Sequence, residues 1–277
     1  RRTREKRTMT VDQPSSPSSS PSSSSAISFP YSKADLQDEV SDSQPLQVQA
    51  VAQLKASTFC HAALILGVTT ILLCYVIAVS LGHVPAWLPM ISDCAVYPPE
   101  SYFFRLGMIL TAALLFVNCG NMYFFLNAVQ FGGPKTSDRW GLIMSGVSCL
   151  GLGIVAAVNE DENGTVHGAS AVVFFFLQMF YMWLVTHRLQ ACQKIDPSIS
   201  SYSIAQKYSI AGSCTIILIL FGLMSTDWGR YSLQIAISEW VGVFLILLFN
   251  WSFCYEFKGE FLATLLYPST STVATQA

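Results

Sequence analysis

Long apolar runs alternate with short polar breaks from residue 57 onward. There are six such runs: Ser57–Leu81, Leu106–Val129, Trp140–Val158, Gly168–Val185, Tyr208–Met224 and Leu233–Phe253. Each is close to the roughly 17–25 residues that an α-helix needs to cross the hydrocarbon core of a bilayer. Membrane-spanning strands would alternate apolar and polar positions over about half this length. The pattern therefore predicts an all-α fold, a polytopic membrane protein built as a six-transmembrane-helix bundle.

The segments on either side of these runs have a different composition. Positions 15–25 consist of nine Ser and two Pro, and several acidic residues follow them. Such a segment has too little apolar surface to offset the entropy lost when it becomes ordered. We therefore expect a disordered, Ser/Pro-rich N-terminal tail over residues 1–53. A transmembrane domain over 54–258 and a short C-terminal tail over 259–277 complete the predicted organisation.

The charges between the runs predict an orientation. Basic residues gather on one side of the predicted membrane: Lys55, Lys135, Arg139, Arg188, Lys194, Lys207 and Lys258. The opposite loops carry two bases, Arg105 and Arg230, against six acidic residues. Because basic loops stay in the cytosol, both termini are predicted to be cytosolic. Asn163-Gly164-Thr165 is a glycosylation sequon in a loop on the other side, so Asn163 is a predicted glycosylation site.

Composition supports the membrane assignment and limits the function classes. Only 12% of the 277 residues are charged, against about 25% in a soluble domain. The net charge of −2 gives no indication of a nucleic-acid partner. A zinc site from Cys60, His61, His187 and Cys192 is conceivable on the cytosolic side, but the usual local spacings are missing. We therefore expect no metal and no cofactor. Cys94, in an outer loop, is expected to be a free thiol or an intermolecular partner.

The third run carries small residues at every fourth position. These are Gly141, Ser145, Cys149, Gly153 and Ala157. In lipid, a face of small side chains lets another helix approach closely and gain packing contacts. We predict a helix-packing seam within the molecule, in preference to a dimer interface or a ligand groove.

Polar residues interrupt the second and sixth runs. Glu239 lies about 10 Å inside the sixth run at 1.5 Å per residue, and Asn250 follows on nearly the same helix face. The second run places three polar residues along one stripe: Thr111, Asn118 and Asn121. We expect both faces to turn inward, where they could pair. An ionisable side chain within a span is a candidate functional residue, but a structural role for Glu239 is equally compatible with the sequence.

The first outer loop, residues 82–102, holds four prolines and several acidic residues. Asp93 and Glu100, together with His167, Glu160 and Asp227, give the outer face groups suited to proton transfer or metal binding. The same residue types also serve as helix caps and form ion pairs between loops, and this structural interpretation is the stronger one.

Several segments together resemble a known family. They are Tyr75–Ser80, Gly82–Val84, Leu88–Asp93, Pro98–Ser101, Gly153–Ala156 with Asn159, Ser238–Trp240 and Ser252–Phe257. They are similar to the damage-regulated autophagy modulator (DRAM) family and its fasting-inducible six-span relatives. The resemblance covers roughly residues 57–262. It marks Asp93, Pro99, Glu100, Glu239 and Trp240 as signature residues without an assigned role.

The resemblance implies a six-span protein of lysosomal, endosomal or plasma membranes. DRAM proteins are linked to autophagy, and their relatives to phosphoinositide kinase complexes, lipid asymmetry and GPI-anchor lipid remodelling. A non-enzymatic modulator of autophagy or membrane lipid organisation is the leading hypothesis. A lipid-modifying enzyme or subunit is the alternative, and a transporter or channel is less favoured. Membrane lipids are the expected partners, with cytosolic proteins contacting the N-terminal tail and the loop of residues 187–207.

Overall fold

Six long helices make up most of the chain in this computed structural model, which describes residues 48–130, 135–258 and 262–268. They are α2 (Ala56–Leu81), α3 (Glu100–Val129), α4 (Thr136–Ala157), α5 (Glu160–Gln193), α6 (Ser201–Met224) and α7 (Trp228–Trp251). Each of the six is long and apolar enough to cross a membrane. The predicted six-helix membrane fold is therefore confirmed. The helices extend beyond the apolar runs, by eight residues at both ends of the fourth.

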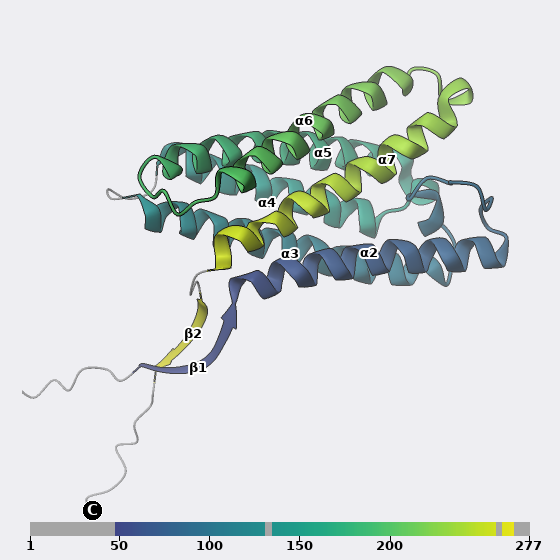
Figure 1. Cartoon of the computed structure of the whole chain (residues 1–277). Coiled ribbons are helices and arrows are strands. Elements are labelled where there is room, and N and C mark those ends of the chain that lie inside the picture. The colour runs from purple at the N-terminus through teal and green to yellow at the C-terminus, as the bar shows by residue number, and fades with distance from the viewer. Residues whose placement is uncertain (1–47, 131–134, 259–261, 269–277) are drawn as a thin grey trace, which may run out of the picture. The chain divides into compact units, whose positions relative to one another are not determined.

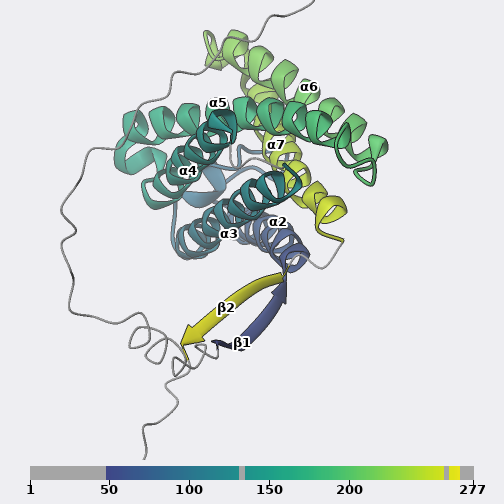
Figure 2. The ribbon, with the colours of Figure 1, turned by 90° about the vertical axis from the view of Figure 1, so that its left-hand side faces the viewer.

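The helices form a ring. Each one packs against the next along the chain, and α7 packs back against α2, which closes the bundle (Figure 2). A buried core of Ile, Leu, Met, Phe, Ala and Cys side chains fills the interior. At the α2–α3 contact, a Cβ on Gly107 would lie 2.1 Å from the hydroxyl of Thr70, so this crossing requires glycine.

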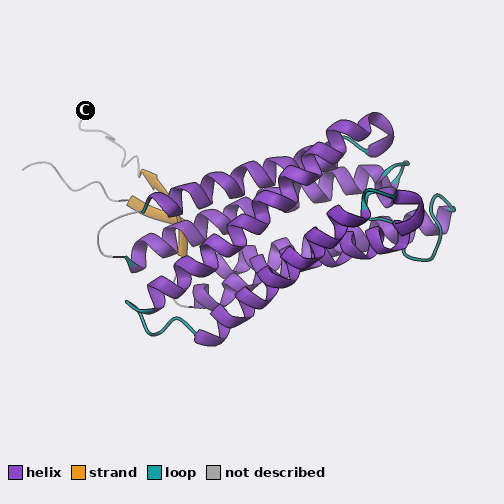
Figure 3. Cartoon of the chain, turned by 90° about the horizontal axis from the view of Figure 1, so that it is seen from above, coloured by secondary structure: helices purple, strands orange, loops and turns teal. Residues whose placement is uncertain are grey.

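The bundle has two ends, which we call the strand end and the loop end. At the strand end, β1 (Val48–Lys55) enters α2, and β2 (Leu262–Pro268) pairs with β1 after the short helix η2 (Ser252–Lys258) (Figures 1 and 3). The loop end holds residues 82–99, which include the short helix η1 (Asp93–Ala95), and the α4–α5 and α6–α7 connections.

The two strands lie where the sequence predicted tails. Residues 48–53 of β1 fall within the tail expected over 1–53, and β2 falls within the tail expected over 259–277. Each segment gains its hydrogen bonds from the other, which lies at the opposite end of the chain, so neither segment alone reveals the pair. The remaining residues of both tails lie outside the described residues.

Local sequence explains how the helices begin and end at the loop end. Gly82 closes α2 in a left-handed conformation with φ +72°, which glycine adopts without strain. Asn159 starts α5 by accepting a hydrogen bond from the Glu162 amide, and the Glu162 carboxylate accepts one from Asn159 in return. Within α5 the backbone of Asn163 is not helical, so the first turn is set apart from the rest of the helix.

Candidate functional site

Glu239 holds the loop of residues 82–99 onto α7, the last spanning helix. One carboxylate oxygen accepts a hydrogen bond from the backbone amide of Ile91 at 2.9 Å, and the other accepts one from Ser92 at 3.3 Å. These two amides lie just before η1. Backbone N–H groups at the start of a helix have no partner within it, so they are free to bind the carboxylate. The next residue, Trp240, donates its indole N–H to the carbonyl of Pro89 at 2.8 Å. Two adjacent side chains of α7 thus fix three backbone groups of the loop, at Pro89, Ile91 and Ser92.

Glu100 fixes the other end of the same loop. Its side chain is fully buried at the start of α3, and its Oε1 lies 2.5 Å from Nδ1 of His83, which follows the end of α2. The second oxygen, Oε2, has no hydrogen-bond partner among the described residues. Pro99, the residue before it, is exposed and occupies the N-cap position of α3. The signature residues therefore tie α2, α3 and α7 together through the loop.

Asp93 and Cys94 lie at the centre of this loop, in η1. Burial, together with the charge of Glu160, raises the pKa of the Asp93 carboxyl above its ordinary value. Burial raises the pKa of the Cys94 thiol to about 12, and the thiol donates to the carbonyl of Met90. Cys94 is thus a free thiol that is buried within this chain.

His167 belongs to a neighbouring corner. Its Nδ1 lies 2.8 Å from the carbonyl of Val158, and its Nε2 lies 3.6 Å from the Glu160 carboxylate. The α4–α5 connection reaches the loop through Asn159, whose amide donates to the carbonyl of Val96. His167 therefore braces the start of α5 through Val158 and Glu160.

The polar faces of α3 and α7 turn inward as predicted. Asn250 is fully buried, donates to the carbonyl of Ile246 and accepts a weak hydrogen bond from the thiol of Cys119 on α3. Thr111 and Asn118 are also fully buried, and Asn118 contacts the α2 residues Phe59 and Cys60. These polar side chains contribute to packing between the helices.

The small-residue face of α4 is only partly a packing seam. Gly141, Ser145 and Cys149 are buried, as expected. Gly153 has open space where a Cβ would project, and Ala157 is exposed, so the prediction is wrong for these two positions. The buried positions continue through Gly151, Leu152 and Ala156 instead. Positions four apart advance by about 40° more than one full turn, so the stripe leaves the buried face.

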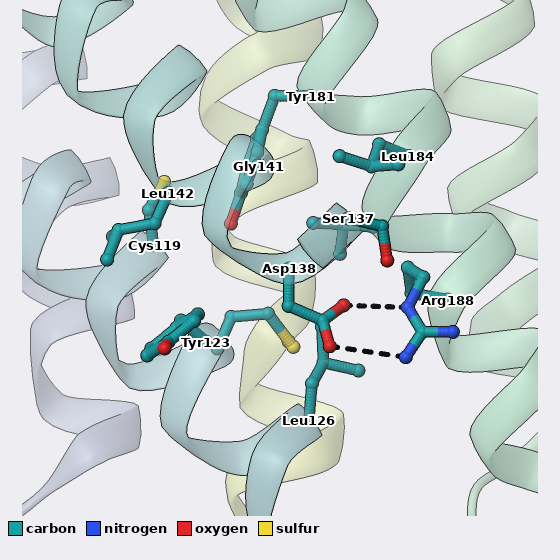
Figure 4. A pocket seen from close by; sticks show the side chains of 12 residues that line it. Cys119, Tyr123, Leu126, Ser137, Asp138, Gly141, Leu142, Tyr181, Leu184 and Arg188 are labelled. Atoms are coloured by element: carbon teal, nitrogen blue, oxygen red, sulfur yellow. Dashed lines mark hydrogen bonds and ion pairs between the residues drawn. The ribbon is translucent and has the colours of Figure 1, made fainter. Parts of the chain in front are cut away.

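Two buried ion pairs at the strand end were not predicted. Arg188 donates to both oxygens of Asp138, at 2.6 and 3.2 Å (Figure 4). It also donates to the side-chain carbonyl of Gln130. Lys207 lies 2.8 Å from the carboxylate of Glu256, which also accepts a hydrogen bond from Ser203. The partners are 50 and 49 residues apart in the chain, so the sequence gives no local signal for either pair.

These ion pairs change the interpretation of the predicted partner-binding loop. Residues 187–193 and 201–207 are helical, and Arg188 and Lys207 are buried. Only residues 194–200 connect the two helices at the surface. The cavity beside Asp138 and Arg188, lined by α3, α4 and α5, has room for about one water molecule (Figure 4).

The residues considered as zinc ligands do not come together. His61 lies beside Cys254, and Cys60 contacts Asn118. Among the described residues, no three His, Cys, Asp or Glu side chains are grouped closely enough to hold a metal ion.

Comparison with known proteins gives a consistent result. The family model described as the Frag1/DRAM/Sfk1/Cwh43P N-terminal domain matches residues 55–260. DNA damage-regulated autophagy modulator protein 1 of Xenopus laevis is 27% identical over 200 residues, 67% of this chain and 83% of the relative. The corresponding protein 2 of Mus musculus is 33% identical over 135 residues, 47% of this chain and 49% of the relative.

A third relative, transmembrane protein 150A of Xenopus laevis, is 25% identical over 189 residues, which are 68% of each chain. No solved structure matches the chain significantly.

Proposed function

Because the chain belongs to the Frag1/DRAM/Sfk1 family, we propose that it acts as a non-enzymatic modulator of autophagy in an endomembrane or plasma membrane. The names of its relatives support the process, since two of them are DNA damage-regulated autophagy modulators. Organisation of membrane lipids is the means by which a six-helix membrane protein of this type would act. Both termini face the cytosol in this proposal.

One observation supports a non-enzymatic role above the others. Both oxygens of the Glu239 carboxylate accept backbone hydrogen bonds, and the neighbouring Trp240 indole is likewise engaged with the loop. A general acid or base must be able to reach the proton that it transfers. In Glu239 each carboxylate oxygen is instead engaged by a backbone amide, and the side chain holds the loop against α7. The loop is thereby presented as a fixed surface on the outer side.

A loss-and-rescue experiment tests the proposal. Cells depleted of the protein are restored with the wild type, with Glu239→Gln or with Glu162→Gln, whose carboxylate forms an exposed pair with Arg105. Autophagic flux is measured as turnover of a lipidated autophagosome marker, with and without blocked lysosomal degradation. We expect depletion to lower flux, and wild type and Glu162→Gln to restore it. Glu239→Gln should fail to restore it although it reaches the membrane.

Unchanged flux after depletion would overturn the proposal. The lipid-modifying alternative is separated by lipid mass spectrometry on the same cells. An enzyme requires a carboxylate oxygen that is free to bind a substrate proton. Among the described residues, Oε2 of Glu100 has no hydrogen-bond partner and is the candidate. A lipid species that accumulates equally in depleted cells and in cells rescued with Glu100→Gln, at normal protein level, would favour the enzyme.

A further inference from the structure

A thiol and an imidazole meet at the strand end of the bundle, outside the site described above. The Sγ of Cys254, in η2, lies 3.6 Å from Nδ1 and 4.0 Å from Nε2 of His61, in the first turns of α2. Cys254 keeps 8% of its surface exposed, and His61, which lies beside it, is exposed. This pair places a nucleophile that is almost fully buried directly beside an exposed base.

The backbone fixes which nitrogen of His61 is the base. Nδ1 lies 2.7 Å from the carbonyl oxygen of Ser57, one helical turn earlier. Because a carbonyl can only accept a hydrogen bond, Nδ1 carries the proton and donates it to Ser57. Nε2 is then unprotonated in the neutral ring and is available to take the proton of the Cys254 thiol.

The surroundings of the pair are those of a membrane boundary. The indole of Trp251 contacts both the His61 ring and the Tyr255 ring edge-on, at 6.2 and 6.0 Å between centroids. The Lys258 ammonium lies 4.8 Å from the centre of the Tyr255 ring. Aromatic residues with a neighbouring lysine are typical of the level at which lipid headgroups meet the hydrocarbon core.

An apolar surface leads from the thiol into the hydrocarbon region. Ile65, one turn after His61 on α2, is 63% exposed, and Leu248, about one turn before Trp251 on α7, is 40% exposed. A hydrocarbon chain attached at Cys254 would extend along these side chains, between two helices that are already in contact.

We propose that Cys254 is an S-acylation site, modified by a long-chain fatty acyl thioester such as an acyl-coenzyme A. The thiol sulfur attacks the thioester carbonyl while His61 Nε2 takes its proton. The new bond joins the acyl carbon to Sγ, the bond from that carbon to the donor sulfur breaks, and the proton passes to the departing thiolate. The proposal rests on the proposed orientation, because acyl-coenzyme A is cytosolic.

The test uses the purified full chain incubated with an alkyne-bearing palmitoyl-coenzyme A, followed by coupling to a fluorophore. The wild type is expected to gain a label that neutral hydroxylamine removes, as it does from thioesters. Cys254→Ser should lose the label. The matched control is Cys214→Ser, a fully buried cysteine on α6, which should label as the wild type does.

His61→Gln tests the base. The initial rate should fall by about 100-fold, the lower end of what a positioned general base contributes. Because hydroxide in solution can replace a missing base, the rate deficit of His61→Gln relative to the wild type should shrink as the pH rises. A merely structural role for His61 would leave the pH profile unchanged. Mapping of the labelled peptide in the wild type locates the site without depending on the folding of any variant.

The proposal is overturned by an unlabelled wild type, by a hydroxylamine-sensitive label that remains in Cys254→Ser, or by a labelled peptide that lacks Cys254. Location of the termini outside the cytosol would overturn both the proposed orientation and this modification.

Discussion

Glu239 is an ionisable residue inside a spanning helix, where a charge without partners costs several kcal/mol. Its partners are the backbone amides of Ile91 and Ser92, which belong to the loop between α2 and α3. The sequence identified Glu239 as exceptional but could not supply its partners. Backbone donors carry no residue signature, and 148 positions separate Glu239 from Ile91.

Replacing Glu239 by Gln is expected to release the loop. A hydrogen bond to a charged group contributes about 1.5–3 kcal/mol, so losing one should speed amide exchange at Ile91 and Ser92 by roughly 10–150-fold. Hydrogen–deuterium exchange with mass spectrometry in detergent or nanodiscs measures this. Glu162→Gln serves as the control, because its exposed pair with Arg105 lies outside the loop and Gln keeps the side-chain oxygen that caps α5. Equal protection in Glu239→Gln would mean that the carboxylate does not hold the loop.

Asp93 makes stability depend on pH in a defined direction. Its pKa is raised in the folded protein, so between the unfolded and folded pKa values the folded state binds more protons. Its contribution to stability is therefore favourable below the ordinary aspartate pKa of about 4 and is lost as the pH rises through the folded pKa. Asp93→Asn should remove this loss.

Thermal unfolding midpoints of the two proteins, measured from acid to neutral pH, test this. We expect Asp93→Asn to gain stability relative to the wild type as the pH increases. A difference that is constant over the whole range would show that the Asp93 carboxyl does not titrate differently in the folded state.

At the scale of single helices, α4 shows where a sequence pattern stops being informative. The spacing of four predicted a continuous small face, and the first three members of it are buried. Because a turn of helix takes 3.6 residues, positions four apart rotate away from the buried face. Gly151, instead of Gly153, then makes the close contact with α5. A Cβ on Gly151 would lie 3.0 Å from the carbonyl oxygen of Ser170, a backbone atom of α5.

Two glycines two residues apart therefore make a matched pair. Gly151→Leu forces α4 away from α5 and should cost about 1–3 kcal/mol, the usual penalty for overpacking. Gly153→Leu has open space at its Cβ and should be tolerated. Folded yield by fluorescence-detected size-exclusion chromatography compares them. A larger loss for Gly153→Leu would restore the stripe predicted from the sequence.

The Lys207–Glu256 pair joins α6 to η2, and both side chains are almost fully buried. Lys207→Met leaves the Glu256 carboxylate without its main partner and should lower stability by about 3–5 kcal/mol. The double variant Lys207→Met/Glu256→Leu should recover most of this, since a buried ion pair can be replaced by apolar side chains at little cost. Thermal unfolding of the single and double variants measures the coupling, and strictly additive losses would contradict it.

At the scale of the whole molecule, the number of spans and the inward polar faces followed from the sequence because length and hydropathy alone decide them. The ends of the helices did not. Glu100, Asp138 and Glu160 begin helices with charged turns that hydropathy assigns to loops. Asp138 pairs with Arg188 of another helix and Glu100 with His83 of the loop, whereas Glu160 pairs with His167 of its own helix. Hydropathy carries no information about any of these partners.

The proposed orientation predicts one glycosylation site. Asn163 is exposed at the loop end, whereas the second sequon begins at Asn250, which is buried in α7. Asn163→Gln should abolish the gel shift produced by endoglycosidase, and Asn250→Gln should leave it unchanged if that variant folds. Protease protection of tags at the two termini provides the independent measurement. If the wild type carries no glycan and its terminal tags are protected from protease added on the cytosolic side, the orientation is the reverse of the proposed one.

The contact between Glu239 and the outer loop also orders events during biosynthesis. Ile91 is synthesised 148 residues before Glu239, which at about 5–20 residues per second is an interval of roughly 7–30 s. In the proposed orientation, the loop crosses the membrane during this interval, before its acceptor has been synthesised. It therefore docks only when the last span has been inserted, so a docked loop reports that the ring of six helices has been completed.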